Sequence, residues 1–309
     1  MTSRPLVSVV LLSYNRPELL DRAIRSVLRQ TYDHLEVFVV DNRSDRSAEV
    51  AMVASRYPQV TLIAHEDNRG FTGGMNSGIG ASRGDYVYLT EDDIELEPDC
   101  LEILLQYLAS HPEVGLVGPV MFNRLDKTIR CAGGYFTLGG TYRMTIVRSI
   151  DRPESSERRQ PYLVMYLPGA MLMARRVLFE RFGGFRDEFF MYVEDVEFCA
   201  RVLKAGLAIA VVPTAHVTHH EPAPGVSAVI QFHKIKNLAT LYLIHAPLTA
   251  LPVFAAKYGA LGALRAFAAG QGRVHLRAWA WTFLHARRLL AQRSPAPLHC
   301  ATLLSGDDR

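Results

Sequence analysis

Two clusters of carboxylates, far apart in the chain, are the residues of this sequence with the clearest chemical potential. The triplet Glu91-Asp92-Asp93 directly follows a predicted strand. Hard divalent cations prefer oxygen ligands, so the triplet suits a metal ion that bridges to phosphates. The pair Glu194-Asp195 follows the aromatic run Phe189–Tyr192, which would partly desolvate a carboxylate and raise its pKa. The sequence therefore predicts one site that holds a metal and one that accepts a proton.

A third metal ligand is expected from the histidines that follow a predicted strand later in the chain. His219 is the candidate because it can return to the same edge as the acidic triplet, and His216 and His220 are its rivals. The triplet by itself also fits the first turn of a helix, because acidic residues favour helix N-termini and Pro98 begins a predicted helix nearby. The triplet alone is therefore a weak indicator of a metal site.

A glycine-rich segment spans residues 68–78, with glycine at positions 70, 73, 74 and 78. It is expected to form a loop that leads into a helix, where the backbone can approach a phosphate or a sugar above the helix N-terminus. The spacing matches neither GxGxxG nor a P-loop, so the sequence indicates neither a dinucleotide-binding fold nor an ATPase. No GxSxG nucleophile elbow is found either.

Strands that alternate with helices must position these groups. Buried strands are predicted over the apolar runs 7–12, 35–40, 60–64 and 86–89, and helices over 17–29, 47–56 and the residues after the glycine-rich segment. This spacing predicts a parallel, doubly wound α/β sheet, in which ligands bind at the carboxyl ends of the strands. The polar residues at those ends are Asn15, Asp41, Asn68 and Asp93. Their convergence predicts a binding site at this edge of the sheet.

The following part of the chain is predicted to be less regular. Residues 130–165 contain Gly-Gly pairs, Thr and Tyr, and are expected to form short antiparallel strands, with an exposed loop at 151–160. A strand over 168–173 and a short helix come next. The acidic pair opens a helix that ends near Gly206, and a strand over 207–212 follows it.

Composition places the chain among globular proteins with an uneven charge distribution. Of its 309 residues, 49% are hydrophobic, which is typical of a protein with a buried core. Residues 1–221 carry 29 acids against 24 bases, whereas residues 222–306 contain nine Lys or Arg and no Asp or Glu. The four cysteines lack CxxC spacing, which favours reduced thiols over a disulfide or a zinc site. The N-terminus does not have the pattern of a signal peptide.

The basic region from residue 231 onward suggests an anionic surface as a partner. Leu238–Ala256 lacks formal charge over a length that raises the question of a membrane span, but Pro247, Pro252 and His245 argue against one. Beyond it, arginines alternate with apolar and aromatic residues, as in a helix that lies in a membrane interface. Helices packed on the body of the protein with solvated arginines fit equally well. The apolar content disfavours nucleic acid.

Five motifs in register resemble those of the family 2 inverting glycosyltransferases of the GT-A fold, in particular the bacterial rhamnosyltransferase-like branch. The motifs are Ser13-Tyr14-Asn15-Arg16, Asp41-Asn42-x-Ser44-Asp45, Asn68-x-Gly70-Phe71-x-Gly73-Gly74-x-Asn76-x-Gly78, the acidic triplet, and Phe189-Phe190-Met191-Tyr192-x-Glu194-Asp195-Val196. Each motif is modest alone, but five in order are specific. The resemblance covers about residues 5–240 and, more loosely, the remainder.

The resemblance implies a GT-A fold, which is Rossmann-like with a mostly parallel doubly wound sheet, followed by a helical C-terminal extension. The catalytic domain is expected at residues 1–230, with a nucleotide-sugar half at about 1–125 and an acceptor half at about 126–230. Residues 231–309 would form the basic, apolar extension, which is a candidate for contact with a membrane.

The resemblance also implies a role for each matching residue. Asp195 matches the general base, with Glu194 beside it. Asp93, Glu91 and His219 match the site of a divalent metal, Mn²⁺ or Mg²⁺. The family has Asp or Asn where this chain has Glu91, so this residue would bind the metal directly or through water. Nucleotide-sugar contacts are expected from Ser13, Tyr14, Asn15, Arg16, Asp41, Asn68, Gly70, Gly73, Asn76 and Asp92. Acceptor contacts are expected from Gly169, Ala170 and Tyr192.

The function implied is inverting transfer of a sugar such as rhamnose, galactofuranose or a hexose. The donor would be UDP- or dTDP-linked, and the acceptor a hydroxyl of a glycan or a polyprenyl-linked glycan in bacterial surface polysaccharide synthesis. The enzyme would be cytoplasmic and peripheral on the inner face of the plasma membrane. Two alternatives remain: a catalytically inactive GT-A-fold scaffold or glycan-binding protein, and a sugar nucleotidyltransferase. The latter needs an N-terminal loop rich in glycine and lysine, which Ser13–Arg16 does not provide.

Overall fold

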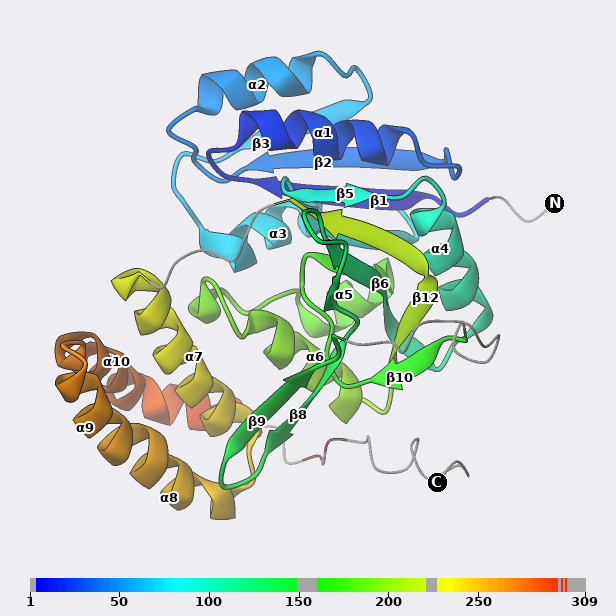
Figure 1. Ribbon diagram of the computed structural model, residues 1–309. Helices are drawn as coiled ribbons and strands as arrows, with labels where there is room; N and C mark the ends of the chain where they lie inside the picture. Colours follow the sequence, from blue (N-terminus) through cyan, green and yellow to red (C-terminus); the bar gives the residue numbers. More distant parts are fainter. Residues whose placement is uncertain (1–3, 149–159, 221–226, 294–295, 297, 299–309) are drawn as a thin grey trace.

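The computed structural model describes residues 4–148, 160–220, 227–293, 296 and 298 (Figure 1). One mixed sheet contains β1 (Val7–Ser13), β2 (Leu35–Asp41), β3 (Val60–Ala64), β4 (Tyr86–Glu91), β5 (Ile94–Leu96), β6 (Val114–Asn123), β7 (Ile129–Cys131), β10 (Tyr162–Val164), β11 (Met171–Arg175) and β12 (Ala208–His219). A separate hairpin consists of β8 (Gly134–Leu138) and β9 (Tyr142–Ile146). The predicted short antiparallel strands are thus present. The predicted loop at 151–160 lies outside the described residues, Gln160 excepted.

Helices cover both faces of the sheet and make up the C-terminal region. The body contains α1 (Pro17–Leu28), α2 (Ser47–Ser55), α3 (Gly70–Ala81), α4 (Cys100–Ser110), α5 (Arg176–Phe182), the 3₁₀ turn η2 (Asp187–Phe189) and α6 (Glu194–Lys204). The C-terminal region contains α7 (Ala228–His245), the 3₁₀ turn η3 (Leu248–Ala250), α8 (Leu251–Phe254), the π-helical turn η4 (Ala255–Ala260), α9 (Leu261–Ala268) and α10 (Gly272–Ala291).

The N-terminal half is a parallel α/β unit, as predicted. Strand β1 pairs in parallel with both β2 and β4, and β2 pairs in parallel with β3. Leu11 and Val39 face α1 and α2, in a core cluster of their own. Helix α3 packs on the opposite face, where a Cβ at Gly78 would lie only 2.2 Å from Val10 Cγ1. Glycine at this position is therefore required for close packing of the helix on the strand.

The other half of the sheet mixes strand directions. Strand β11 runs antiparallel between β4 and β6, while β12 is parallel to β6 and pairs antiparallel with β5 and β10. The strand order β10-β12-β6-β11-β4-β1-β2-β3 therefore joins a parallel unit to a mixed one. The predicted fold class, a mostly parallel GT-A-like sheet with flanking and C-terminal helices, is confirmed.

Two local predictions were wrong. The glycine-rich segment is not a loop up to Gly74, because α3 already begins at Gly70. The strand expected over 207–212 continues through Pro213 to His219. Proline is tolerated there because the pairing with β6 has a register shift between Val211 and His216, where the ladder does not require its missing N–H.

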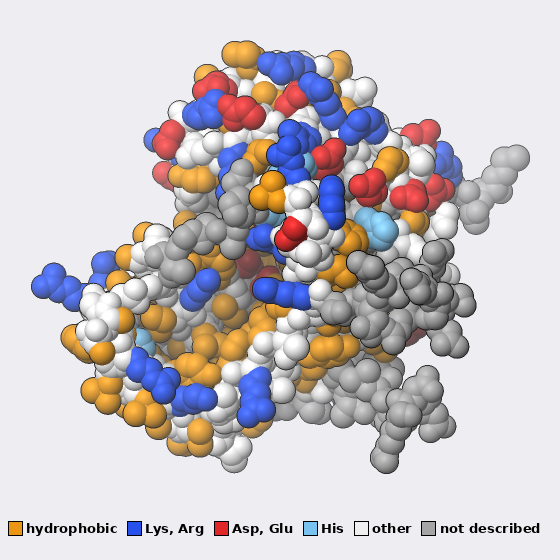
Figure 2. All heavy atoms as spheres, in the orientation of Figure 1, with side chains coloured by type: hydrophobic (Ala, Val, Ile, Leu, Met, Phe, Trp, Pro, Cys, Tyr) orange, Lys and Arg blue, Asp and Glu red, His pale blue; other side chains and the backbone are white. Residues whose placement is uncertain are grey.

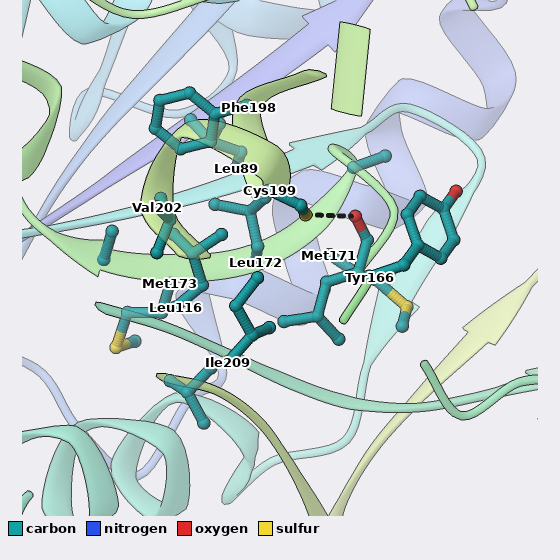
Figure 3. Packing of buried hydrophobic residues seen from close by; sticks show 14 of the residues in the cluster. Leu89, Leu116, Tyr166, Met171, Leu172, Met173, Phe198, Cys199, Val202 and Ile209 are labelled. Carbon is teal, nitrogen blue, oxygen red and sulfur yellow. Dashed lines mark hydrogen bonds between the residues drawn. The ribbon is translucent and has the colours of Figure 1, made fainter. Parts of the chain in front are cut away.

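The core between α6 and the sheet is apolar and closely packed (Figure 3). Phe198, Cys199 and Val202 of α6 meet side chains of β11, β6 and β12, among them Leu172 and Ile209. Three of the four cysteines, Cys100, Cys131 and Cys199, are buried free thiols, in line with the predicted lack of a disulfide, and Cys300 lies outside the described residues.

A buried ion cluster ties α6 to the C-terminal region. Glu197 is fully buried, and its carboxylate lies 2.8 Å from Arg186, 2.8 Å from Arg201 and 3.0 Å from His245 at the end of α7. Burial alone would raise the pKa of Glu197, but Arg201, His245 and Arg186 outweigh it and lower that pKa to about 2. Glu197 is thus ionised and links α6 to the last turn of α7.

The C-terminal helices form a compact layer beside the body (Figure 1). The uncharged run 238–256 is divided, because α7 ends at His245 and Pro247 follows. None of the helices in the described part of the chain combines the length and apolar content that crossing a bilayer requires. Helix α10 instead packs along α7, with His275, Ala278 and Leu289 buried.

Candidate active site

Acidic side chains gather where the carboxyl ends of β1, β2 and β4 meet the end of β12. Figure 2 shows a hollow between the body and the C-terminal helices, with acidic side chains visible in its depth. Asp41, Asp92 and Asp93 are all buried, with exposed fractions of 1%, 4% and 6%. The structure therefore contains the cluster of polar residues that was predicted at the carboxyl ends of the strands.

Asp92 is held by the end of β1. Its Oδ2 accepts hydrogen bonds from the Ser13 hydroxyl at 2.9 Å and from the Tyr14 N–H at 3.0 Å. Arg16 donates from Nη1 to Asp93 Oδ2 at 2.7 Å and lies 3.5 Å from Asp92 Oδ1. The first motif and the acidic triplet thus form one connected unit, in which the Arg16 guanidinium supplies the positive charge.

The register of β12 decides among the three candidate histidines. His219 Nε2 lies 3.6 Å from Asp93 Oδ2. His216 bonds to the Pro213 carbonyl, and His220 bonds to the Glu95 carboxylate at 2.8 Å. Only His219 of the three therefore approaches the acidic triplet through its side chain.

The described residues do not contain a ready group of three or more His, Cys, Asp or Glu side chains arranged to hold a metal ion. The chemistry of the donor set nevertheless fits a hard cation. Asp93 Oδ1 is buried without a hydrogen-bond partner in the described structure. Burial and the neighbouring Asp93 and Asp92 raise the pKa of Glu91 to about 8, and burial raises the pKa of Asp92 to about 7. Acids crowded in this way are stabilised by a bound cation.

The loops after β1 and β2 are bonded to each other. The Asn15 backbone N–H donates to Ser44 Oγ at 2.9 Å, and the Asp45 N–H donates to Asn15 Oδ1 at 2.7 Å. Asn15 has a φ of 63°, which asparagine tolerates better than most residues. Asp41 accepts from the Ser44 N–H at 3.0 Å. Tyr14, beside them, is 45% exposed and free to stack on a flat ligand.

The residues of the glycine-rich segment mainly hold the structure around this edge. Asn68 Oδ1 accepts from the Gly70 N–H at 2.8 Å. Gly70, with a φ of 67°, has no room for a Cβ against Phe190, and Gly73 packs on Arg69. Asn76 bonds to the backbone N–H and carbonyl of Phe185 at 2.8 and 2.7 Å. Their predicted contacts with a nucleotide-sugar stay predictions.

The proposed base, Asp195, lies in the first turn of α6 within a shell of donors. Tyr166 donates its hydroxyl to Asp195 Oδ2 at 2.7 Å, and the Val196 N–H donates to Oδ1 at 2.8 Å. Burial raises the pKa of Asp195, and the hydrogen bonds from Tyr166, Val196 and Gly169 oppose the rise. The carboxylate is thus oriented and kept able to ionise.

The sequence analysis did not include Tyr166 in the site. This residue follows a short strand outside every motif, and its sequence neighbours do not indicate a functional role. Of the predicted acceptor residues, Gly169 donates its N–H to Asp195, and Ala170 is buried. Tyr192 is partly exposed, and Lys234 Nζ lies 4.6 Å from the centre of its ring. Tyr192 is therefore the member of this set with an accessible side chain, and its contact with an acceptor stays a prediction.

The two carboxylate clusters influence each other's ionisation. The charge of Asp195 contributes to raising the pKa of Glu91, and that of Glu91 to raising the pKa of Glu194. Burial and Asp195 raise the pKa of Glu194 well above its ordinary value, and Glu194 Oε2 is buried without a hydrogen-bond partner among the described residues. The acidic triplet and the Glu194-Asp195 pair thus interact electrostatically.

Comparisons with known proteins match this chain to a family model and to several relatives. The model of the family described as "Glycosyl transferase family 2" matches residues 8–183. An N-acetylglucosaminyl-diphospho-decaprenol L-rhamnosyltransferase of Mycobacterium tuberculosis is 30% identical over 241 residues, which cover 70% of this chain and 76% of that protein.

Two solved structures resemble the fold. GalNAc-T7 with UDP, GalNAc and Mn²⁺ has a TM-score of 0.67 at 14% identity, over 92% of this chain and 58% of its own. A mannosyltransferase of Pyrobaculum calidifontis in complex with GDP-Man and Mn²⁺ has a TM-score of 0.57 at 20% identity, over 99% of this chain and 89% of its own. At these identities the likeness concerns the fold.

Proposed function

The chain belongs to glycosyl transferase family 2, and on this premise we propose that it transfers a sugar, with inversion, from a nucleoside-diphosphate-sugar to an acceptor hydroxyl. The donor would be UDP- or dTDP-linked, and the acceptor a glycan or polyprenyl-linked glycan of a bacterial surface polysaccharide. The observation that carries this proposal is Asp195, a half-buried carboxylate that accepts a hydrogen bond from Tyr166, together with the approach of His219 to Asp93. The decaprenol-linked substrate in the mycobacterial relative's name supports the acceptor class.

Asp195 is assigned the role of general base. In an inverting transfer the acceptor hydroxyl attacks the anomeric carbon from the face opposite the leaving diphosphate, so its proton must be taken up on that face. Tyr166, Val196 and Gly169 donate to the Asp195 carboxylate and leave its remaining lone pairs for the acceptor. Burial and the charge of Asp195 raise the pKa of Glu194, which lies beside the proposed base.

Asp93 and His219, with Glu91 beside them, would hold a divalent cation, Mn²⁺ or Mg²⁺. When bound, the cation would neutralise charge on the departing diphosphate. Mn²⁺ is named for both solved structures of similar fold, which supports this assignment. Tyr14, Asn15, Asp41 and the nearby loops would bind the nucleotide, with the exposed ring of Tyr14 placed to stack on the base.

The two alternatives have less support. A sugar nucleotidyltransferase needs a phosphate loop after β1, whereas Ser13–Arg16 is occupied in holding Asp92 and Asp93. An inactive scaffold has no need of an oriented Asp195, or of a buried carboxylate oxygen such as Asp93 Oδ1 that lacks a partner among the described residues. Both arguments favour a working transferase.

The first test is the thermal stability of the purified protein with UDP, dTDP or GDP, each with and without Mn²⁺. A ligand that binds only the folded state raises its stability, by about 2.7 kcal/mol at a hundredfold excess over Kd. We expect one nucleotide to stabilise the protein in a metal-dependent way, and UDP or dTDP to be that nucleotide. Absence of a response to all three would contradict the proposal and favour the scaffold.

The C-terminal helices are proposed to bind an anionic membrane surface, where a lipid-linked acceptor is found. Exposed hydrophobic side chains of α8–α10, here called the apolar edge, are Val253, Leu261, Leu264, Phe267, Leu276, Phe283, Leu284 and Leu290. Exposed arginines accompany them: Arg265, Arg273, Arg277, Arg287 and Arg288. Figure 2 shows hydrophobic and basic side chains intermixed over this region. Apolar side chains beside arginines, without acids, match an interface of anionic lipids.

Binding to vesicles tests this surface. We expect sedimentation with vesicles that contain anionic phospholipid, and weaker binding to purely zwitterionic vesicles or at high salt. The variant Phe283→Ser/Leu284→Ser removes the two most exposed residues of the edge, 82% and 79% exposed, and should weaken partitioning by at least about tenfold. The matched control, Met52→Ser/Leu125→Ser, changes exposed residues of the body and should bind normally. Equal losses in both variants would contradict the assignment.

A further inference from the structure

The segment that leads into Asp195 has a backbone conformation that ordinary residues avoid. Phe190, Tyr192 and Val193 have φ values of 65°, 65° and 71°. This region of φ is unfavourable for residues with a Cβ, and most so for a β-branched one such as valine. A conformation of this kind persists only where contacts around it hold it in place. We call residues 189–193 the base loop.

Asn237 of α7 supplies such contacts to the base loop. Its side chain is fully buried. Its Nδ2 lies 2.8, 2.8 and 2.6 Å from the carbonyl oxygens of Phe189, Met191 and Tyr192, so its two N–H groups are shared among three acceptors. Its Oδ1 is buried without a partner among the described residues. Because three carbonyls face this one nitrogen, the amide can point only one way. A single side chain thus fixes three of the peptide units of the base loop.

Other residues of α7 continue the same support. Lys236 donates from Nζ to the Glu188 carbonyl, and the His233 ring stacks on Phe190 with 4.9 Å between ring centres. From the donor side, the Thr72 N–H of α3 donates to the Phe190 carbonyl at 3.2 Å. The base loop is therefore held between α3, which belongs to the nucleotide side, and α7.

Val193 connects the base loop to the proposed base, Asp195. It is the N-cap of α6, in the left-handed conformation, and Glu194 and Asp195 follow it directly. If Val193 relaxed to a negative φ, the first turn of α6 would reorient. The 2.7 Å bond between Tyr166 and Asp195 depends on the present orientation. The geometry of the base is therefore set by the base loop.

We propose that Asn237 is a positioning residue for sugar transfer: it holds the base loop in its strained conformation and so aims Asp195 at the acceptor hydroxyl. The inference rests on the proposed function. Asn237 does not touch the reacting atoms; it acts through the carbonyls of Phe189, Met191 and Tyr192. Its placement on α7 makes this helix part of the catalytic apparatus.

The test compares Asn237→Ala with Thr240→Ala. Thr240 is equally buried on α7, but its hydroxyl bonds to the Lys236 carbonyl of its own helix. We expect Asn237→Ala to lower kcat by about a hundredfold, as small misplacements of catalytic groups do. Stabilisation by the nucleotide should stay unchanged. The acid limb of the kcat profile should move to higher pH, because Asp195 loses the Tyr166 bond that lowers its pKa. Thr240→Ala should show neither effect.

A second substitution that restores kcat would distinguish a positioning role of Asn237 from a general loss of structure. Glycine adopts a positive φ freely, so Val193→Gly in the Asn237→Ala background should recover at least about tenfold of the lost kcat, with the Val193→Gly single variant as the baseline. If Asn237→Ala does not fold, Asn237→Ser, which keeps one donor, takes its place. The inference would be overturned if the acid limb of the kcat profile stayed in place in Asn237→Ala and Val193→Gly did not restore activity. An equal loss of kcat in Thr240→Ala would also overturn it. Absence of transfer by the wild-type protein would instead overturn the proposed function.

Discussion

Asp195→Asn is expected to lower kcat by roughly 10²- to 10⁴-fold, which is the usual contribution of a positioned general base. Asparagine has the shape of aspartate but cannot take the proton of the acceptor hydroxyl. The change leaves Asp93, His219 and Arg16 in place, so stabilisation by nucleotide and metal should remain close to that of the wild type. An equal loss of nucleotide binding and turnover would contradict the role of Asp195.

Tyr166→Phe is expected to change the pH dependence of activity without removing the base. The Tyr166 hydroxyl lowers the pKa of Asp195, so its removal raises that pKa. The base works only when ionised, so activity is lost as the pH falls through this pKa, and the variant should lose it at a higher pH than the wild type. Tyr162→Phe is the matched control, because the Tyr162 hydroxyl bonds to the Ala132 carbonyl and not to Asp195.

Asp93→Ala is expected to abolish the metal-dependent part of nucleotide binding. Asp93 has a buried Oδ1 without a partner among the described residues, and His219 Nε2 lies 3.6 Å from its Oδ2, which makes it the main ligand of the proposed cation. Loss of a charged ligand should reduce the stabilisation by nucleotide with Mn²⁺ to the value without Mn²⁺.

The control for this variant is Asp99→Ala, which removes an exposed carboxylate whose side chain does not cap the helix it precedes. Its response to metal and nucleotide should equal that of the wild type. Unchanged metal dependence in Asp93→Ala would remove Asp93 from the site.

The parallel half of the fold could be predicted because each element is encoded locally. Val7–Ser13 is buried throughout, and Pro17 then begins α1, where a missing N–H costs nothing. The carboxyl ends of such strands must share one edge, so the positions of Asp41 and Asp93 followed from the strand pattern. The mixed half of the sheet was harder to predict from the sequence, because the path of β12 past Pro213 depends on its pairing with β6.

The parts of the site that could not be predicted from the sequence depend on contacts between residues distant in the chain. Tyr166 and Asp195 are brought together by packing of α6 on the sheet, and Asn237 reaches the base loop only because α7 lies against it. The choice of His219 over His216 and His220 likewise follows from the register of β12 with β5. The ion pair of Arg16 with Asp93 unites two motifs that are separate in the sequence.

The cluster around Glu197 has a consequence for recombination between relatives. Exchange of C-terminal parts at the predicted boundary near residue 230 would separate Glu197 from His245, and would leave a buried carboxylate without one of its three partners. Loss of a partner of a buried charge typically costs several kcal/mol. A crossover after Ala246 would keep this cluster within one parent. Hybrids that inherit α7 together with the sheet therefore keep this buried charge fully paired.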